Sequence, residues 1–232
     1  MTARSRPFDV VFEDEHVLVV NKRAGLLSVA PTRGAEKNLA DLVRRSCANA
    51  APAGAPPVVP VHRIDRDTSG VIVFARTPAA EERLLASFRE RAVKKRYLLL
   101  CNHVPRPREG TRQSFIVDRG DTAVSSPRPA AGGRAAITRW RVIEAFRDAA
   151  FVEAEPLTGR FNQIRLHFVD LHCPLIGERK YAVASRCPFR HSRPLLHAAS
   201  LTFPHPATGK SIEVSAPPPA DFEAFLARLR AG

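Results

Sequence analysis

The chain alternates between short runs of apolar, often β-branched residues and amphipathic stretches with apolar residues every three or four positions. The first pattern is typical of strands, and the second is typical of helices with one buried face. We therefore predict helices that begin near Asn38, after Thr77, near Phe161 and after Pro219. The runs with strand character are residues 8–13, 16–21, 58–61, 71–76, 97–100, 113–118, 137–146, 150–157, 197–203 and 211–215.

This mixture of elements predicts an α+β protein dominated by antiparallel sheet. Residues 8–232 are expected to form a single domain, because no internal repeat or composition break divides them. Residues 1–7 show no apolar periodicity and are predicted to be a disordered lead-in. The stretches that are rich in Pro, Gly or Arg, and are predicted to be loops, are residues 48–57, 103–111 and 119–134.

The charge balance is strongly basic, with 36 lysines and arginines against 23 aspartates and glutamates, a net charge of +13. Such an excess attracts polyanions, of which nucleic acid is the commonest. An anionic membrane surface is the alternative, and a genome rich in arginine codons would also raise the charge. No stretch resembles a membrane span, and the N-terminus lacks the apolar core of a signal peptide. We expect a nucleic-acid partner and no membrane.

The four cysteines are scattered and form no CxxC pair, which predicts a reducing, cytoplasmic location. His172, Cys173, Cys187 and His191 are of metal-ligating types. The paired short spacings of a structural zinc site are absent, so we predict no metal site there.

The candidate chemistry lies between the apolar runs at residues 58–61 and 71–74. Asp65 stands in the intervening turn with arginines close on either side, and opposite charge keeps a carboxylate ionised. An ionised acid on such a turn is a candidate nucleophile or base, and a structural ion pair explains the same residues equally well. Tyr97 lies in an apolar strand, and its simplest interpretation is a core residue. Arg165 lies on a predicted helix, and its simplest interpretation is a surface residue.

A metal-binding DxD motif is another interpretation of Asp65 and Asp67, as in magnesium-dependent phosphotransferases. Such enzymes need an unbroken apolar strand directly before the first acid. Here His62 and Arg63 interrupt that strand, which disfavours this alternative.

Residues 62–70, HRIDRDTSG, resemble the HRLDxxTSG signature of the RluA-type pseudouridine synthases. Further segments resemble other motifs of that family, and the similarity extends from about Phe8 to about Phe225. These segments are residues 13–25, 95–97, 159–167 and 196–209.

The resemblance implies the pseudouridine synthase fold: a mixed, mainly antiparallel sheet in two halves with flanking helices and a central active-site cleft. It also implies isomerisation of uridine to pseudouridine in structured RNA, such as rRNA or tRNA stem-loops. The N1 glycosidic bond breaks, the base turns, and C5 forms the new bond, with no cofactor or metal. A catalytically inactive RNA-binding protein on the same fold is the alternative.

The resemblance also implies roles for single residues. Asp65 is expected to be the nucleophile, Arg165 to pair with it, and Tyr97 to stack on the uracil and relay a proton. The target base must leave its helix, and Arg66 is expected to enter the space that it vacates. The other substrate-binding residues implied are His62, Arg63, Thr68, Ile164 and Leu166. Phosphate contacts are expected from the basic groups of residues 89–96 and 179–193 and from Arg160. The residues named for these contacts are Arg91, Lys94, Lys95, Arg160 and Lys180.

The chain departs from the family pattern at a few positions. Phe161 and Asn162 stand where many relatives have Thr-His or Lys-His, which affects the expected pocket wall. Glu178 replaces a common aspartate, and Arg23 replaces a common proline. With no extra RNA-binding domain expected before Phe8, target selection is assigned to the catalytic domain itself, acting as a monomer without an obligatory protein partner.

Overall fold

A computed structural model describes residues 7–31, 36–48, 58–182 and 187–232. The chain divides into two compact units, one of residues 1–94 and 198–217 and the other of residues 95–197 and 218–232. Residues 1–6 of the predicted lead-in and residues 49–57 of the predicted loop lie outside the described residues.

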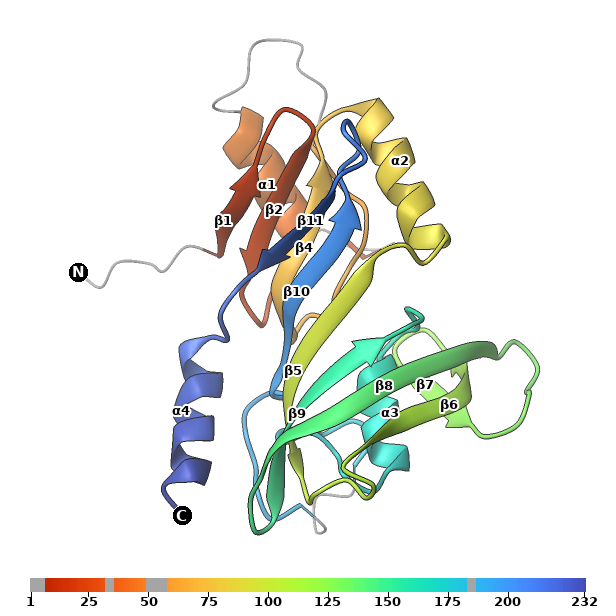
Figure 1. The fold of residues 1–232 in the computed structure, drawn as a ribbon, viewed down its shortest axis with the longest axis vertical. Coiled ribbons are helices and arrows are strands. Elements are labelled where there is room, and N and C mark those ends of the chain that lie inside the picture. Colours follow the sequence, from red (N-terminus) through yellow and green to blue (C-terminus); the bar gives the residue numbers. More distant parts are fainter. Residues whose placement is uncertain (1–6, 32–35, 49–57, 183–186) are drawn as a thin grey trace. The chain divides into compact units, whose positions relative to one another are not determined.

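The first unit is built on a sheet in which β1, β2, β4 and β10 are neighbours in that order. β2 pairs antiparallel with β1 and with β4, while β3 pairs with β4 and β11 with β10. Figure 1 shows these elements with the helices α1 and α2. Their bounds are β1 Phe8–Glu13, β2 Val17–Lys22, α1 Leu39–Ala48, β3 Val59–Pro60, β4 Ser69–Ala75, α2 Pro78–Arg89, β10 Leu196–Pro204 and β11 Ser211–Ser215.

Alternation along β2 and β4 creates the core of this unit. Val17 and Val19 on β2 share one face with Val71 and Val73 on β4, and this face packs against Leu84 of α2. β4 is buried along its whole length, as expected for a strand with neighbours on both sides.

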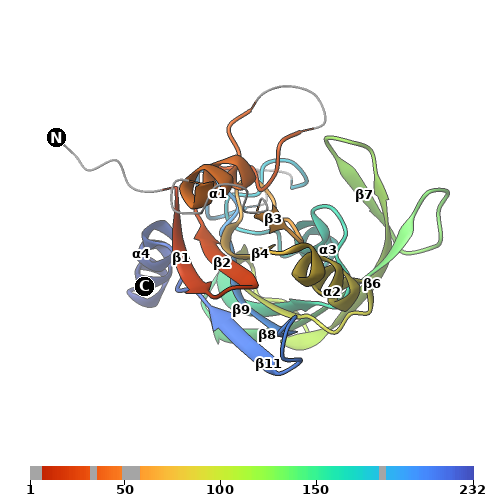
Figure 2. The same ribbon diagram turned by 90° about the horizontal axis from the view of Figure 1, so that it is seen from above.

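The second unit contains a sheet in the order β5-β9-β8-β6-β7, and every neighbouring pair is antiparallel. Figure 2 shows the short strand β7 beside β6. The bounds are β5 Lys94–Asn102, β6 Glu109–Asp118, β7 Ala123–Ser126, β8 Arg134–Ala145, β9 Ala149–Pro156, α3 Gln163–Asp170 and α4 Ala220–Arg230. The predicted α+β class and mainly antiparallel sheet are confirmed.

Three predictions about this unit were wrong. Residues 109–111, placed in a loop by their composition, begin β6, because they pair with β8. Residues 123–126, placed in a loop by their composition, form β7, because pairing with β6 holds a short polar segment that lacks strand character. The helix predicted to begin near Phe161 begins at Gln163. Asn162 adopts a left-handed conformation with a φ of 53°, which ends the preceding loop and leaves Phe161 outside the helix.

The predicted apolar face of α4 is confirmed, since Phe222, Phe225, Leu226 and Leu229 are all buried. They pack against Phe151 and neighbouring apolar residues of the second unit. None of the helices in the described parts of the chain is long and apolar enough to cross a membrane.

Candidate active site

The Asp65 turn, residues 61–68, connects the two-residue strand β3 to β4. Asp65 is half-buried, between the buried Ile64 and the exposed Arg66. The backbone N–H of Thr68 donates to the Asp65 carbonyl at 3.2 Å and closes the turn. The candidate nucleophile therefore stands at the start of a fully buried strand.

His62 and Gly70 attach the turn to the rest of the first unit. Nε2 of His62 accepts a hydrogen bond from the Val73 backbone at 3.0 Å, and its ring stacks on Phe88 with centroids 4.8 Å apart. Gly70 has a φ of +121°, and a Cβ there would lie 2.1 Å from the Ala198 carbonyl oxygen. Glycine is required at this position both by the backbone conformation and by the close approach of β10. Contact between His62 and RNA stays a prediction.

Arg66, the residue after the candidate nucleophile, is held by an acidic partner. Its guanidinium donates to both carboxylate oxygens of Glu36, at 2.5 and 2.9 Å, with both side chains nearly half exposed. The hydrogen bonds from Arg66 lower the pKa of Glu36, and the same bonds raise the pKa of Arg66. Sequence analysis missed Glu36, because it lies 30 residues away in a segment without periodicity.

The remaining candidates of the first unit differ in exposure. Arg63, Arg91 and Lys94 are exposed, whereas Thr68 is buried. Exposure suits the phosphate contacts predicted for Arg91 and Lys94, which stay predictions.

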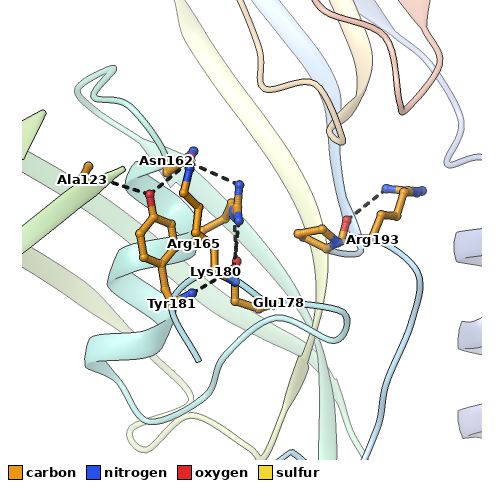
Figure 3. A network of polar contacts seen from close by, with 8 residues as sticks. Ala123, Asn162, Arg165, Glu178, Lys180, Tyr181 and Arg193 are labelled. Atoms are coloured by element: carbon orange, nitrogen blue, oxygen red, sulfur yellow. Dashed lines mark hydrogen bonds and ion pairs between the residues drawn. The ribbon is translucent and has the colours of Figure 1, made fainter. Parts of the chain in front are cut away.

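In the second unit, Arg165 on α3 forms a two-point ion pair with Glu178 (Figure 3). Its Nε and Nη2 donate to the two carboxylate oxygens at 2.7 and 2.8 Å. Burial by itself raises the pKa of Glu178, but hydrogen bonds and charge from Arg165, with two backbone N–H donors, outweigh it and lower that pKa. The predicted pairing of Arg165 with Asp65, which belongs to the other unit, stays a prediction.

Asn162 and Tyr181 complete this arrangement. The Asn162 side-chain oxygen accepts from Nη1 of Arg165 and from the Tyr181 hydroxyl, each at 3.3 Å. The Arg165 guanidinium also lies over the Tyr181 ring, 5.3 Å from its centroid. The sequence showed Asn162 and Glu178 only as departures from the family pattern, and it gave no signal for Tyr181.

A buried polar network fixes the other side of α3. His167 is fully buried, and its ring nitrogens contact the hydroxyls of Ser114 at 2.9 Å and Thr138 at 2.8 Å. Gln163 donates to the same Thr138 hydroxyl at 2.9 Å. Burial lowers the pKa of His167 to about 4, so the ring is neutral at physiological pH.

The other candidates of the second unit lie in separate surroundings. Tyr97 packs with Ile164 in one apolar cluster, whereas Leu166 lies in another cluster. Lys95 donates to the Thr158 carbonyl at 3.3 Å, close to Arg160, while Lys180 is exposed. The structure thus places Tyr97 with Ile164, and Lys95 with Arg160.

Arg193 is unsuited to the phosphate contact implied for residues 179–193. It is buried, it forms a two-point ion pair with Asp221 at 2.7 and 2.9 Å, and it donates to the Pro194 carbonyl. It is a structural residue that attaches the first turn of α4.

The described residues contain no group of three or more His, Cys, Asp or Glu able to hold a metal ion. Cys173 is buried, and burial raises its pKa to about 11. It is therefore a thiol at physiological pH, and metal ligation requires the thiolate.

The sequence of this chain is similar to that of known RNA-modifying enzymes. A family model described as RNA pseudouridylate synthase matches residues 16–170. The dual-specificity RNA pseudouridine synthase RluA of Escherichia coli K12 is 38% identical over 214 residues, covering 92% of this chain and 93% of that protein. The ribosomal large subunit pseudouridine synthase D of Zymomonas mobilis is 34% identical over 239 residues, covering 96% and 73%.

Solved structures agree with these matches. Human RNA pseudouridylate synthase domain containing 4 superposes with a TM-score of 0.81 at 27% identity, covering 95% of this chain and 92% of that one. Human RNA pseudouridylate synthase domain containing 1 has a TM-score of 0.72 at 23% identity, covering 97% and 95%, and supports the fold.

Proposed function

Because the chain belongs to the RNA pseudouridylate synthase family and is a pseudouridine synthase acting on RNA, we propose that Asp65 is its nucleophile. The observation that carries the proposal is the construction of the Asp65 turn. The residues on both sides of Asp65 are hydrogen-bonded through their backbones to the segment 22–28. A nucleophile must be held in a fixed orientation toward the atom that it attacks, and a carboxylate on an immobilised turn meets this requirement.

The proposed chemistry assigns one task to each of three further residues. Departure of the base leaves an electron-poor sugar, which the Asp65 carboxylate stabilises or traps. Tyr97 stacks on the uracil and relays a proton, and Arg165 steadies the negative charge of the reacting groups. Arg66 occupies the space that the target base vacates when it leaves its stack.

Arg66 can enter the RNA by releasing Glu36 and contacting the RNA in its place. Its guanidinium is bound to Glu36, and both side chains remain close to half exposed. Exposed ion pairs of this kind are worth little in free energy, so RNA competes effectively for the arginine.

We propose rRNA or tRNA stem-loops as substrates. The names of the relatives support this choice, since one is a ribosomal large subunit pseudouridine synthase and another is dual-specific. The net charge of +13, with Arg91, Lys94, Lys95, Arg160 and Lys180 as phosphate contacts, supports RNA binding that weakens steeply with salt.

The proposal extends to a cytoplasmic enzyme that acts as a monomer. The thiols of Cys47, Cys101 and Cys173 suit a reducing compartment. Neither a metal nor a cofactor is assigned a role, because a carboxylate, a phenol and a guanidinium supply the chemistry required.

Asp65→Ala tests the proposal, with Asp67→Ala as the matched control on the same turn. In an assay of pseudouridine formation on stem-loop RNA, we expect Asp65→Ala to lower the rate by about 1,000-fold or more, as for other nucleophile deletions. RNA binding should survive, and Asp67→Ala should act at close to the unmodified rate. Chelation by EDTA should leave turnover unchanged.

Each other outcome has a definite meaning. Unmodified activity in Asp65→Ala removes this residue from its role. Equal losses in both variants, with activity restored by Mg²⁺ after chelation, favour the DxD interpretation. RNA binding by the unmodified protein without any pseudouridine formation supports the non-enzymatic alternative. Mapping pseudouridines in total RNA with and without the gene identifies the substrate.

A further inference from the structure

We propose that Lys22 and Ser28 are positioning residues that clamp the backbone on both sides of Asp65, and that the rate of isomerisation depends on this clamp. The inference rests on the proposed role of Asp65. It assigns to the segment 22–28 a task that its sequence does not reveal, since only a lysine, a serine and backbone groups take part.

Ser28 holds the residue before Asp65. Its side chain is 3% exposed, its Oγ donates to the Ile64 carbonyl at 2.6 Å, and it accepts from the Ile64 N–H at 3.1 Å. One hydroxyl therefore satisfies both backbone groups of Ile64. Because the Ile64 carbonyl belongs to the peptide bond that leads into Asp65, this contact fixes the plane from which Asp65 projects.

Lys22 holds the residue after Asp65. It is 0% exposed, and its Nζ donates to the carbonyls of Arg66 at 2.9 Å, Leu26 at 2.7 Å and Arg23 at 3.0 Å. The Arg66 carbonyl also accepts from the Gly25 N–H at 2.9 Å. A single carbonyl beside the candidate nucleophile is thus held from two directions by the segment 22–28.

Burying a lysine has an unfavourable free energy of desolvation, so it contributes little to the stability of a fold. Removing an ammonium from water costs several kcal/mol per ion in general, and an apolar side chain of similar volume often stabilises a protein as well or better. Lys22 is the last residue of β2, and the three carbonyls named above belong to residues 23–26 and to the Asp65 turn. This pattern fits a residue retained to define backbone geometry at a site.

These contacts indicate that Ser28 and Lys22 affect the reaction by positioning Asp65 and not by contacting the substrate. The hydrogen bonds described above join Ser28 and Lys22 to backbone groups of the Asp65 turn and of residues 23–26, and both side chains are buried. Loss of the clamp should therefore change the rate of the chemical step and leave RNA affinity almost unchanged. A displacement of about 1 Å at a reacting group lowers a rate by roughly 100-fold in general.

The experiment compares Ser28→Ala with Ser28→Thr, which keeps the hydroxyl, and with Thr77→Ala as the control. Thr77 Oγ1 accepts from the Ala80 N–H at 3.1 Å and caps α2, so its loss removes a hydroxyl hydrogen bond of the same unit. Rates are measured in single turnover with saturating enzyme on stem-loop RNA, and RNA affinity is measured separately. Amide hydrogen exchange at Ile64 reports the clamp directly.

We expect Ser28→Ala to lower the single-turnover rate roughly 10- to 100-fold, with RNA affinity within about twofold and faster exchange at Ile64. Ser28→Thr should recover most of the rate, and Thr77→Ala should keep all of it. A folded Ser28→Ala protein with a rate within about twofold of the unmodified enzyme would overturn the inference. So would equal losses in Ser28→Ala and Thr77→Ala, which indicate a general effect of stability.

If Ser28→Ala does not fold, Ser28→Cys provides the same test with the side-chain shape preserved and the hydrogen bonds weakened. An undiminished rate in a folded Ser28→Cys protein would again overturn the inference. Asp65→Ala, measured alongside, separates the two proposals. An active Asp65→Ala protein contradicts the nucleophile, whereas an inactive one beside a fully active Ser28→Ala contradicts only the clamp.

Discussion

Asp65 and Arg165, two charged residues assigned to the chemistry, belong to different units and are held in different ways. The turn that carries Asp65 is held through the backbone groups of Ile64 and Arg66, by Ser28 and by Lys22 at the end of β2. Arg165 is held through its own guanidinium, by a two-point ion pair with Glu178.

The difference indicates what each residue requires. A clamp on neighbouring backbone groups aims a carboxylate without using the oxygens that are to react. An ion pair to the guanidinium sets the position and the charge environment of Arg165 together. We therefore expect Arg165 to respond to changes of charge and pH, and the Asp65 turn to respond to the loss of single hydrogen bonds.

The largest effect is expected from Glu178→Ala. It removes the Glu178 carboxylate from the guanidinium of Arg165, whose side chain is 12% exposed, and breaking a buried pair costs about 3–5 kcal/mol of unfolding free energy. Since the folded-state pKa of Glu178 lies below the ordinary value of 4.5, the pair stabilises the fold above about pH 4.5 and is lost as the pH falls further. Unfolding by urea at several pH values, with activity of the folded fraction, measures both effects.

Asp221→Ala is the control, because it removes the carboxylate of another two-point arginine pair in the same unit, in which Arg193 is buried and the Asp221 side chain is 41% exposed. We expect it to lower stability without lowering the rate of the folded enzyme. If Glu178→Ala also leaves that rate unchanged, the pair is structural and the contrast with the Asp65 turn disappears.

A second effect is expected from acidification through His167. The unfolded side chain binds a proton near pH 6.5, whereas the folded one does so only near pH 4. The fold therefore loses stability as the pH falls from 6.5 to 4, by roughly 3 kcal/mol through this residue alone. His167→Gln should flatten unfolding free energy against pH within this window.

The exposed His103 provides the control, and His103→Asn suits its positive φ of 64°. That variant should keep the pH dependence of the unmodified protein. If the unfolding free energy of His167→Gln depends on pH as strongly as that of the unmodified protein, His167 is not the source of the acid sensitivity. The expectation that acid destabilises the region around α3 would then lose its support.

The smallest effect is expected from Glu36→Gln, which releases Arg66 beside the Asp65 turn. Because this exposed pair competes with RNA for the arginine, we expect KM for RNA to fall by about twofold to threefold, with kcat unchanged. Glu82→Gln removes the same charge from an exposed position on α2. Equal changes in the two variants would mean that net charge, rather than the partner of Arg66, sets the affinity.

Much of the fold was predictable because its signals are local. The β-branched runs around β2 and β4, the apolar face of α4 and the Thr77 cap each depend on residues close in sequence. β7 was missed because its four residues form a strand only through pairing with β6. The start of α3 was missed because it depends on the backbone conformation of Asn162.

By itself, the sequence determined the order of strands and helices, the polar turn that carries Asp65 and the family, because periodicity and a contiguous motif are properties of neighbouring residues. Only the tertiary structure decided which side chains hold the reactive ones. Lys22, Ser28 and Glu178 lie 44, 36 and 13 residues from the groups that they contact. Such partners are selected by chain folding, which brings distant segments together and excludes water from the hydrogen bonds between them, and no local pattern encodes that choice.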